Sequence, residues 1–525
     1  MPFRKKQGIN RNRVIAAIDI GTTSVRLAIA QIREKSKIEI LDTLQQSVSL
    51  GRDTFTKGVI QRSSIEDCVQ ALKSFKKVLA EYQITSLDQI KIVATSAVRE
   101  ALNKDVFLDR VKIATGFTIE VIDDVDVSRL TYLSIRSYME CHDLKCESDV
   151  LVAEMSGGNT ELLHLRKGNV VLSKGYRLGA LRLREMLGEY RAPLSSHKEL
   201  INNEIERTIN LISLDINKKK KMTIIAIGGD ARLMASHICP DWNGADPVTI
   251  TLDLMKAFTS QIIDLSIDEI VNRFHIAFND AETLGPSLLF YINLVETYKL
   301  KSVIVSDISM RHGLLREIAM IEWWTDDYVS QIVNSALELG KKYSFDETHA
   351  QHVAEIASIL FTALENEHLL NSRYKLLLKI ASLLHDIGSY ISVRSHHKHS
   401  HYLIQNSELF GLNRKDIQII ALIARYHRRS APKPIHAEYM SFDHDSRLII
   451  VKLAAILRIA DALDRSNNHR IKEITCSKKK DTLLITIPDI EDVSLEELAL
   501  QSKGTMFEDV YGLKVVLRKK TSFME

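Results

Sequence analysis

Short apolar runs of strand length alternate with segments of helical periodicity along the first part of the chain. From Val14 the sequence reads VIAAIDIGTTSVRLAIAQI, two apolar runs joined by a turn rich in Gly, Thr and Ser, and KIEILDTLQQSVSL adds a third run. Runs of this length with turn residues between them predict β-strands. Apolar residues at helical spacing follow, and they predict helices near residues 65–82 and over Lys104–Thr115.

The same pattern starts again at Asp149. DVLVAEMSGGNTELLHL is an apolar run, a Gly-containing turn and a second run, and NVVLSKGYRLGALRL supplies another strand. The strand-like runs TIIAIGGDARL and SVIVSDISM come later, and the first contains a diglycine. Two copies of strand, polar turn and strand indicate two similar α/β lobes, over residues 14–134 and 135–320, whose turns face each other across a cleft.

The pattern changes at about Asp326. From there the period is helical and strands disappear, which predicts an all-α domain over residues 326–470. Short strand-like runs return in IKEITCSKKKDTLLITI and GLKVVLRKK, so residues 471–525 are predicted to form a small α+β domain. A chain of 525 residues is too long for one compact domain, which agrees with this division.

Composition excludes several classes of protein. Hydrophobic residues make up 45% and charged residues 26% of the chain, which is typical of globular proteins. Lys+Arg minus Asp+Glu is 70 − 67 = +3, so no global field favours nucleic acid or a membrane surface. The five cysteines are scattered and odd in number, which indicates a reducing compartment. With no apolar run of the roughly 20 residues that span a membrane, we expect a cytoplasmic protein.

The two polar turns are candidate phosphate sites. A Gly/Ser/Thr turn between strands exposes consecutive backbone N–H groups and hydroxyls, which suit phosphate oxygens. Asp19 opens the first turn, and its carboxylate could hold hydrated Mg²⁺. A matched pair of turns allows two lobes to bind one phosphate from both sides. The candidate phosphate-binding residues are Gly21, Thr22, Thr23, Ser24, Ser156, Gly157, Gly158, Asn159, Thr160, Gly228 and Gly229.

The paired turns resemble the sugar-kinase/actin superfamily, in which two ribonuclease-H-like lobes enclose a phosphorylated ligand. Further segments resemble the exopolyphosphatase/guanosine pentaphosphate phosphohydrolase family, in the family's order: AAIDIGTTSVRLAIA, ATSAVREALN, EMSGGNTEL, LGALRL, AIGGDARLMA, SDISMRHGLL, LLHDIG, HHKHSHYLI and LAAILRIADALDRS. The resemblance implies an α/β fold of two actin-like lobes. It also implies hydrolysis, in which water attacks a terminal phosphoryl group of polyphosphate or the 5′ γ-phosphate of guanosine pentaphosphate.

The resemblance further implies roles for single residues. Arg99 matches a family arginine that could pair with phosphate through its two-pronged guanidinium group. Asp19 and Glu161 are candidates for Mg²⁺ coordination or for positioning the attacking water.

The chain departs from the family pattern where catalysis is expected. The family's catalytic glutamate lies in a stretch resembling GEEEARL, and the same register, residues 124–130, has Val127 directly before the serine. Asp126 is one residue earlier and one methylene shorter, Glu154 stands where the family has Asp, and Asp230 follows the diglycine where Thr is usual. Two hypotheses follow. Either Asp126 or Glu154 acts as the base and the protein is a phosphatase, or these lobes bind polyphosphate or guanosine tetra/pentaphosphate as a sensor without turnover.

Histidines are concentrated in the predicted helical domain, where residues 349–469 hold 12 of the 18. A His, a His-Asp pair and a later Asp on three helices resemble the HD phosphohydrolase superfamily, which binds a divalent metal in a helical bundle. The resemblance implies that Mn²⁺, Fe or Mg²⁺ is bound by His349, His385, Asp386 and Asp461. Three more histidines sit where a second metal or a phosphate contact could be supplied, namely His396, His397 and His427.

The leading hypothesis is an Mg²⁺-dependent exopolyphosphatase that acts on polyphosphate, with guanosine pentaphosphate as a second candidate substrate. A degenerate regulatory protein that binds polyphosphate or an alarmone, and a nucleotide phosphohydrolase that depends on the HD-type domain, are the alternatives. The family resemblance implies a homodimer, and we expect neither specific nucleic-acid binding nor a membrane partner.

Overall fold

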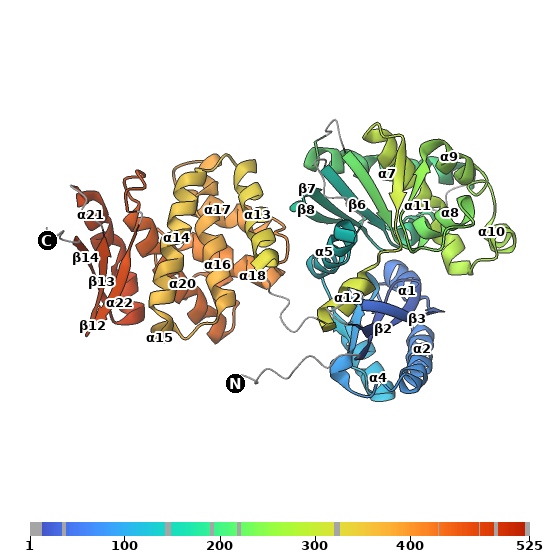
Figure 1. Ribbon diagram of the computed structural model, residues 1–525, viewed down its shortest axis with the longest axis horizontal. Helices are drawn as coiled ribbons and strands as arrows, with labels where there is room; N and C mark the ends of the chain where they lie inside the picture. Colours follow the sequence, from blue (N-terminus) through green and yellow to red (C-terminus); the bar gives the residue numbers. More distant parts are fainter. Residues whose placement is uncertain are drawn as a thin grey trace. The chain divides into compact units, whose positions relative to one another are not determined.

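The structure is a computed structural model that describes residues 13–33, 38–141, 149–189, 194–217, 222–319, 326–428, 430–471, 473–487 and 492–519. The chain divides into two compact units, Met1–Thr325 and Asp326–Glu525. The first unit contains two β-sheets with helices around them (Figure 1), and the second is a helical bundle that ends in a small sheet.

The first sheet has five strands in the order β3-β2-β1-β4-β5. Strand β1 pairs antiparallel with β2 and parallel with β4, so the carboxyl ends of β1 and β4 lie side by side. The turn after β1 and the segment after β4 therefore reach the same edge of the sheet. The strands are β1 Val14–Ile20, β2 Ser24–Ile32, β3 Ile38–Ser47, β4 Ile90–Ala94 and β5 Glu120–Val121.

Four helices follow strands of the first sheet, and they are α1 Leu50–Lys57, α2 Arg62–Glu81, α3 Ser96–Arg99 and α4 Lys104–Thr115. Their apolar faces pack on the sheet, with Phe75 and Phe107 fully buried. The helix predicted near residues 65–82 is α2, which begins three residues earlier, and α4 has the bounds that its sequence predicts.

The second sheet has six strands in the order β10-β11-β9-β6-β7-β8. Strands β6 and β7 form an antiparallel pair, and β6 is parallel to β9, so this sheet repeats the arrangement of β2, β1 and β4. The strands are β6 Asp149–Met155, β7 Thr160–Arg166, β8 Asn169–Tyr176, β9 Met222–Ile227, β10 Val248–Thr251 and β11 Ser302–Val305. The main helices beside it are α6 Ala180–Glu189, α7 Leu194–Asp215, α8 Gly229–Ile238, α9 Leu252–Ser260, α10 Ile267–Phe274 and α11 Phe278–Thr297.

The prediction of one strand over residues 169–183 is wrong in its second half. The strand ends at Tyr176, and α6 begins at Ala180. Gly179 between them lies so close to the second polar turn that a Cβ there would be 2.4 Å from the carbonyl oxygen of Gly157. This backbone contact brings the start of α6 against the turn.

Two helices connect the sheets, α5 Asp124–Cys141 and α12 Met310–Ala319: α12 packs on β1 and β4, and α5 packs on α12 and on β7 and β8. A Cβ on Gly313 of α12 would lie 2.2 Å from the carbonyl oxygen of Leu130 on α5, so the two helix backbones are in direct contact. Leu130, Leu314 and Leu315 are buried in one cluster with residues of β1 and β2. The helix α5 thus has a fixed position, and its first turn lies at the end of the first sheet.

The second unit begins with a helical bundle, as the period after Asp326 predicts. Its helices are α13 Asp326–Lys342, α14 Glu347–Ala363, α15 Glu365–His368, α16 Ser372–Leu384, α17 His396–Gln405, α18 Arg414–Arg425, α19 Ala437–Met440 and α20 His444–Leu463. A three-stranded sheet follows, ordered β12-β13-β14, with two helices: β12 Thr475–Lys479, β13 Thr482–Ile487, α21 Ser494–Lys503, α22 Thr505–Tyr511 and β14 Lys514–Lys519. In the described part of the chain, none of the helices has the length and apolar character to cross a bilayer.

Candidate active site

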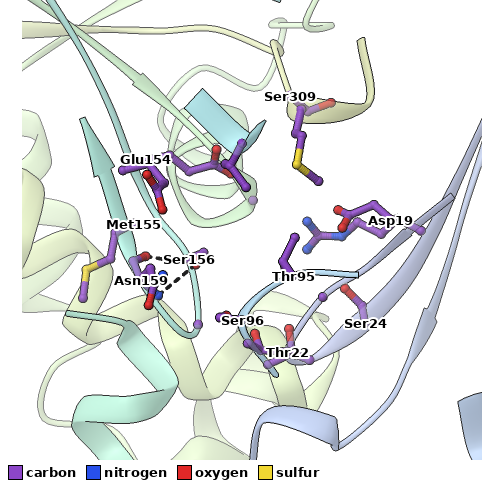
Figure 2. A pocket seen from close by; sticks show the side chains of 18 of the residues that line it. Asp19, Thr22, Ser24, Thr95, Ser96, Glu154, Met155, Ser156, Asn159 and Ser309 are labelled. Carbon is purple, nitrogen blue, oxygen red and sulfur yellow. Dashed lines mark hydrogen bonds between the residues drawn. The ribbon is translucent and has the colours of Figure 1, made fainter. Parts of the chain in front are cut away.

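The two polar turns lie on opposite sides of one cleft in the first unit, with a cavity of about 120 Å³. Figure 2 shows Thr22 and Ser24 on one side and Glu154, Ser156 and Asn159 on the other. The turns touch at one end, because a Cβ on Gly157 would lie 2.3 Å from Thr22 Oγ1. Only glycine allows this approach.

Each turn is closed by its own backbone. The N–H of Gly21 donates to the carbonyl of Ser24 at 3.0 Å, and the N–H of Ser156 donates to the carbonyl of Asn159 at 2.9 Å. Both turns are short connections of antiparallel strands. Such tight turns present hydroxyls and N–H groups to the cleft, which is the arrangement that phosphate oxygens require.

Most of the residues predicted for this site line the cleft. They are Asp19, Gly21, Thr22, Thr23, Ser24, Arg99, Glu154, Ser156, Gly157, Asn159, Glu161 and Gly229. Four are absent from its lining, namely Asp126, Gly158, Thr160 and Gly228. Thr160 is fully buried and donates to the carbonyl of Leu178 at 2.7 Å, and Gly158 packs against the Ser96 hydroxyl.

The predicted base Asp126 points away from the cleft. It lies in the first turns of α5, where its carboxylate is 3.5 Å from Arg129, and Arg129 also pairs with Glu317 at 3.1 Å. Burial, together with the neighbouring Asp123, raises the pKa of Asp126. Val127 faces the cleft instead, so the position of the family's glutamate is exposed to the ligand site but carries no carboxylate.

Asp19 and Glu154 occupy equivalent places at the ends of β1 and β6, and both face the cleft (Figure 2). Burial raises the pKa of each carboxyl, against the opposing effect of nearby arginines. Arg311 from α12 lies 3.5 Å from Asp19, and burial lowers the pKa of this guanidinium to about 10. Two buried carboxylates that face one space are a donor set that suits Mg²⁺, which prefers oxygen ligands.

Four guanidinium groups line the cleft, those of Arg26, Arg99, Arg232 and Arg311. The sequence analysis singled out only Arg99. Arg311 stands in the segment SDISMRHGLL, whose position in the family pattern could have identified it. Arg26 and Arg232 carry the same signal, since they stand in the quoted segments AAIDIGTTSVRLAIA and AIGGDARLMA. Clustered guanidiniums can make paired hydrogen bonds to phosphate oxygens.

The second unit brings all four predicted metal ligands together. His349 Nε2 lies 3.9 Å from Asp461 Oδ1, and His385 Nε2 lies 4.0 Å from the same oxygen and 3.8 Å from Asp386 Oδ1. Ligands that bind one ion through bonds of about 2.1 Å lie roughly 3 to 4 Å apart, so these separations fit a metal ion.

Hydrogen bonds orient the imidazoles for this role. The Nδ1–H of His385 donates to the carbonyl of Ser382 at 2.6 Å, and that of His349 donates to Asp464 at 2.7 Å. Each ring therefore turns a lone pair at Nε2 toward the carboxylates, as metal-binding histidines do. Among the described residues, the buried His385 Nε2 has no hydrogen-bond partner, which is what a metal ion would relieve.

Further residues surround this cluster. His396 and His427 approach Asp386 Oδ1 to 3.0 and 3.5 Å, and Lys503 from α21 forms an ion pair with Asp461. Burial lowers the pKa of His427 to about 3, so this ring is neutral. A cavity of about 470 Å³ opens beside the cluster, and its lining includes His349, Asp386, Asp461, Tyr343, Tyr390 and Arg465.

Two α/β sheets that enclose a cleft with paired Gly/Ser/Thr turns, four arginines and buried carboxylates define a phosphohydrolase of the two-lobed, actin-like class. The family model of the Ppx/GppA phosphatase family matches residues 28–321, and that of Ppx/GppA phosphatase, domain III, matches residues 333–503. The chain belongs to the Ppx/GppA phosphatase family, whose members hydrolyse phosphoanhydride bonds.

Curated relatives are similar to this chain over nearly its whole length. A guanosine-5′-triphosphate,3′-diphosphate pyrophosphatase of Photobacterium profundum is 22% identical over 516 residues, which cover 96% of this chain and 98% of the relative. The protein of the same name from Aliivibrio fischeri (strain ATCC 700601 / ES114) is 22% identical over 484 residues, 90% of this chain and 91% of its own. Among solved structures, an exopolyphosphatase from Cytophaga hutchinsonii is 19% identical with a TM-score of 0.52, and it covers 58% of this chain and 98% of its own.

Proposed function

We propose that the cleft of the first unit hydrolyses the terminal phosphoryl group of inorganic polyphosphate or of guanosine pentaphosphate. The observation that carries the proposal is the convergence of both polar turns and four arginines on one cleft. A terminal phosphoryl group concentrates negative charge on three oxygens, and such a reaction needs fixed donors around these oxygens more than it needs covalent chemistry. The turn residues Thr22, Ser24 and Ser156 would supply hydroxyl donors, and Arg99 and Arg311 would supply charge.

Asp19 and Glu154 would hold Mg²⁺ in this cleft. When bound, the ion would neutralise charge on the phosphate oxygens. Of the two carboxylates predicted as the base, Glu154 lines the cleft and Asp126 does not.

The experiment is phosphate release by the purified full-length chain from tripolyphosphate, long polyphosphate and guanosine pentaphosphate, with and without Mg²⁺. Release from any of these above a blank supports the proposal. Binding of these ligands without release would instead support the alternative, in which the cleft is a sensor of polyphosphate or alarmones. Unchanged release by the Arg311→Ala variant would contradict the assignment of the cleft.

For the second unit, we propose a divalent-metal site formed by His349, His385, Asp386 and Asp461. The buried Nε2 of His385, which has no hydrogen-bond partner among the described residues, favours it. A bound metal would act as a Lewis acid toward a phosphate ester in the adjoining cavity, which supports nucleotide phosphohydrolysis as the second candidate function. Elemental analysis of the purified protein tests the site: we expect close to one equivalent of metal, lost in Asp386→Ala, and a metal content near zero in the wild type would contradict it.

The family resemblance supports two further proposals. A homodimer is expected, which sedimentation of the full chain would test. A role in the turnover of guanosine polyphosphates would follow if guanosine pentaphosphate is the preferred substrate, and the substrate panel above would decide this.

A further inference from the structure

Asp124 stands in the cleft at a position that the family motif does not assign to a carboxylate. It is the first residue of α5, and Val127 lies one helical turn later on the same face. Both side chains line the cleft, whereas Asp126 does not. Val127 carries no carboxylate where the family has its glutamate. Asp124 supplies a carboxylate on the same helix face, one turn nearer the helix N-terminus.

Both halves of the site hold the Asp124 side chain. Its Oδ1 accepts a hydrogen bond from Arg99 Nη2 at 2.5 Å and another from Asn159 Nδ2 at 3.2 Å. Arg99 is itself fixed, since its Nη1 donates to the carbonyl of Ile122 at 2.9 Å. Arg99 follows the first sheet's β4, and Asn159 belongs to the second polar turn, so Asp124 connects the two sides of the cleft.

The other oxygen of this carboxylate is accessible. Both hydrogen bonds are made to Oδ1, so Oδ2 is left for a water molecule, and 44% of the side chain is exposed to solvent. A base must be able to reach the attacking water within hydrogen-bond distance, and its direction must be fixed. Asp124 meets both conditions, because Oδ1 is held by two hydrogen bonds and the side chain is exposed in the cleft.

The other carboxylates of the cleft fit this role less well. Asp19 pairs with Arg311 at 3.5 Å, and Glu154 lies among the same arginines, so both carboxylates already face fixed charges. Glu161 is 9% exposed, and its carboxylate lies close to Gly175, where a Cβ would be 3.2 Å from its oxygens. Of these carboxylates, Asp124 combines exposure to the cleft with a fixed orientation beside the turn residues.

We propose that Asp124 is the general base of the cleft. A water molecule donates a hydrogen bond to Oδ2 and attacks the terminal phosphorus of the substrate. The new bond joins the water oxygen to phosphorus, the bond from phosphorus to the bridging oxygen breaks, and the electron pair leaves with the shortened phosphate chain. The water proton passes to Asp124 and is then released to solvent. This inference rests on the proposed hydrolysis in the same cleft.

The test compares Asp124→Asn with the wild-type full-length chain, using tripolyphosphate as the substrate and phosphate release as the readout. Asparagine keeps an oxygen that accepts from Arg99 and Asn159 but cannot take a proton. We expect kcat to fall by about 10²- to 10⁴-fold, while KM and the dissociation constant of tripolyphosphate change by less than about threefold. The matched variant Asp126→Asn removes a carboxylate two residues away, outside the cleft, and we expect its kcat to stay within about threefold of the wild type.

A second variant separates proton transfer from a structural role. In Asp124→Ala, added formate can occupy the space of the lost carboxylate, and we expect it to restore part of kcat, with no such effect on the wild type. A purely structural contribution would not respond to formate. Wild-type kcat in Asp124→Asn would overturn the inference and leave the proposed hydrolysis standing. If the wild-type chain releases no phosphate from any substrate, the proposed function fails first and Asp124 has no reaction to catalyse.

Discussion

Asp230 is a half-buried acid in the cleft of the first unit, and replacing it by Asn removes the charge that it can carry. The residue follows the diglycine at the start of α8, and its Oδ1 accepts a hydrogen bond from Thr283 Oγ1 at 3.0 Å. Burial, helped by the nearby Asp280, raises its pKa from 3.8 to about 6. Because the pKa in the folded state is the higher one, the favourable contribution is complete below pH 3.8 and is lost as the pH rises through 6.

The size of the loss follows from the shift. About two pKa units correspond to about 3 kcal/mol once the pH is well above 6, an upper value for a side chain that is partly exposed. Asp230→Asn cannot ionise, so we expect the variant to be more stable than the wild type by up to about 3 kcal/mol at pH 8 and by only about 1 kcal/mol at pH 4.5. Calorimetric unfolding of both proteins at the two pH values measures this difference.

The same substitution should also change ligand binding. At pH 8 the wild-type cleft carries the Asp230 charge against the ligand, so Asp230→Asn should bind tripolyphosphate more tightly by titration calorimetry, and the gain should shrink toward pH 5. The reasoning would be refuted by an equal stability difference at both pH values, since a pH-independent effect has its origin in packing or hydrogen bonding. Thr283→Val, which removes the hydrogen bond and leaves the acid in place, is the matched control.

Two further substitutions test the contacts that build the sites. Gly157→Ala places a methyl group 2.3 Å from Thr22 Oγ1, so we expect a loss of about 1 to 3 kcal/mol in stability and weaker tripolyphosphate binding. Calorimetry measures it, and a variant as stable as the wild type would show that the turns do not touch. Lys503→Met leaves the buried Asp461 without its ammonium partner, so the metal-free protein should lose about 3 to 5 kcal/mol. Bound Mn²⁺ should restore most of this loss, and an equal loss with and without Mn²⁺ would contradict the metal site.

The strands and turns of the first unit could be predicted because their signals are local. A short apolar run such as VIAAIDI, bounded by turn residues, is typical of a strand that is buried on both faces of a sheet. The Gly/Thr/Ser segment after it marks the end of the strand. The meeting of the two turns could also be predicted from the repeated pattern of strand, polar turn and strand. Two lobes built from the same hairpin carry their turns at equivalent positions. The misplaced strand over residues 169–183 shows the limit, because the contact of Gly179 with the other turn is made by residues far apart in sequence.

The identity of the carboxylate in the cleft could not be predicted without knowing where α5 begins. In a helix, residues three apart share a face and a residue one position away turns by about 100°. A family motif aligned by sequence favours Asp126 as the neighbour of Val127, yet the helical turn directs Asp126 toward Arg129 and brings Asp124 into the cleft. Lys503 was missed for a related reason: it comes from α21, which follows the helical bundle, and no spacing in the sequence links it to Asp461.

The charges of the cleft explain how a chain with a net charge of only +3 can bind a polyanion. Arg311 faces Asp19, Arg99 faces Asp124, and Arg232 lies 3.3 Å from Asp307, so three of the four guanidiniums already have a carboxylate partner, while Arg26 donates to Gln45 Oε1. At these three arginines, a phosphate that enters must share an existing ion pair rather than meet free charge, and the field outside the cleft remains weak. When a phosphate replaces a carboxylate beside an arginine, the number of ion pairs in the cleft stays nearly constant. The affinity for the ligand should therefore depend less steeply on salt concentration than it does at an open basic surface. If the cleft binds the proposed substrates, discrimination would rest on the geometry of the turns around a terminal phosphoryl group with three oxygens, and less strongly charged anions would compete poorly with the resident carboxylates.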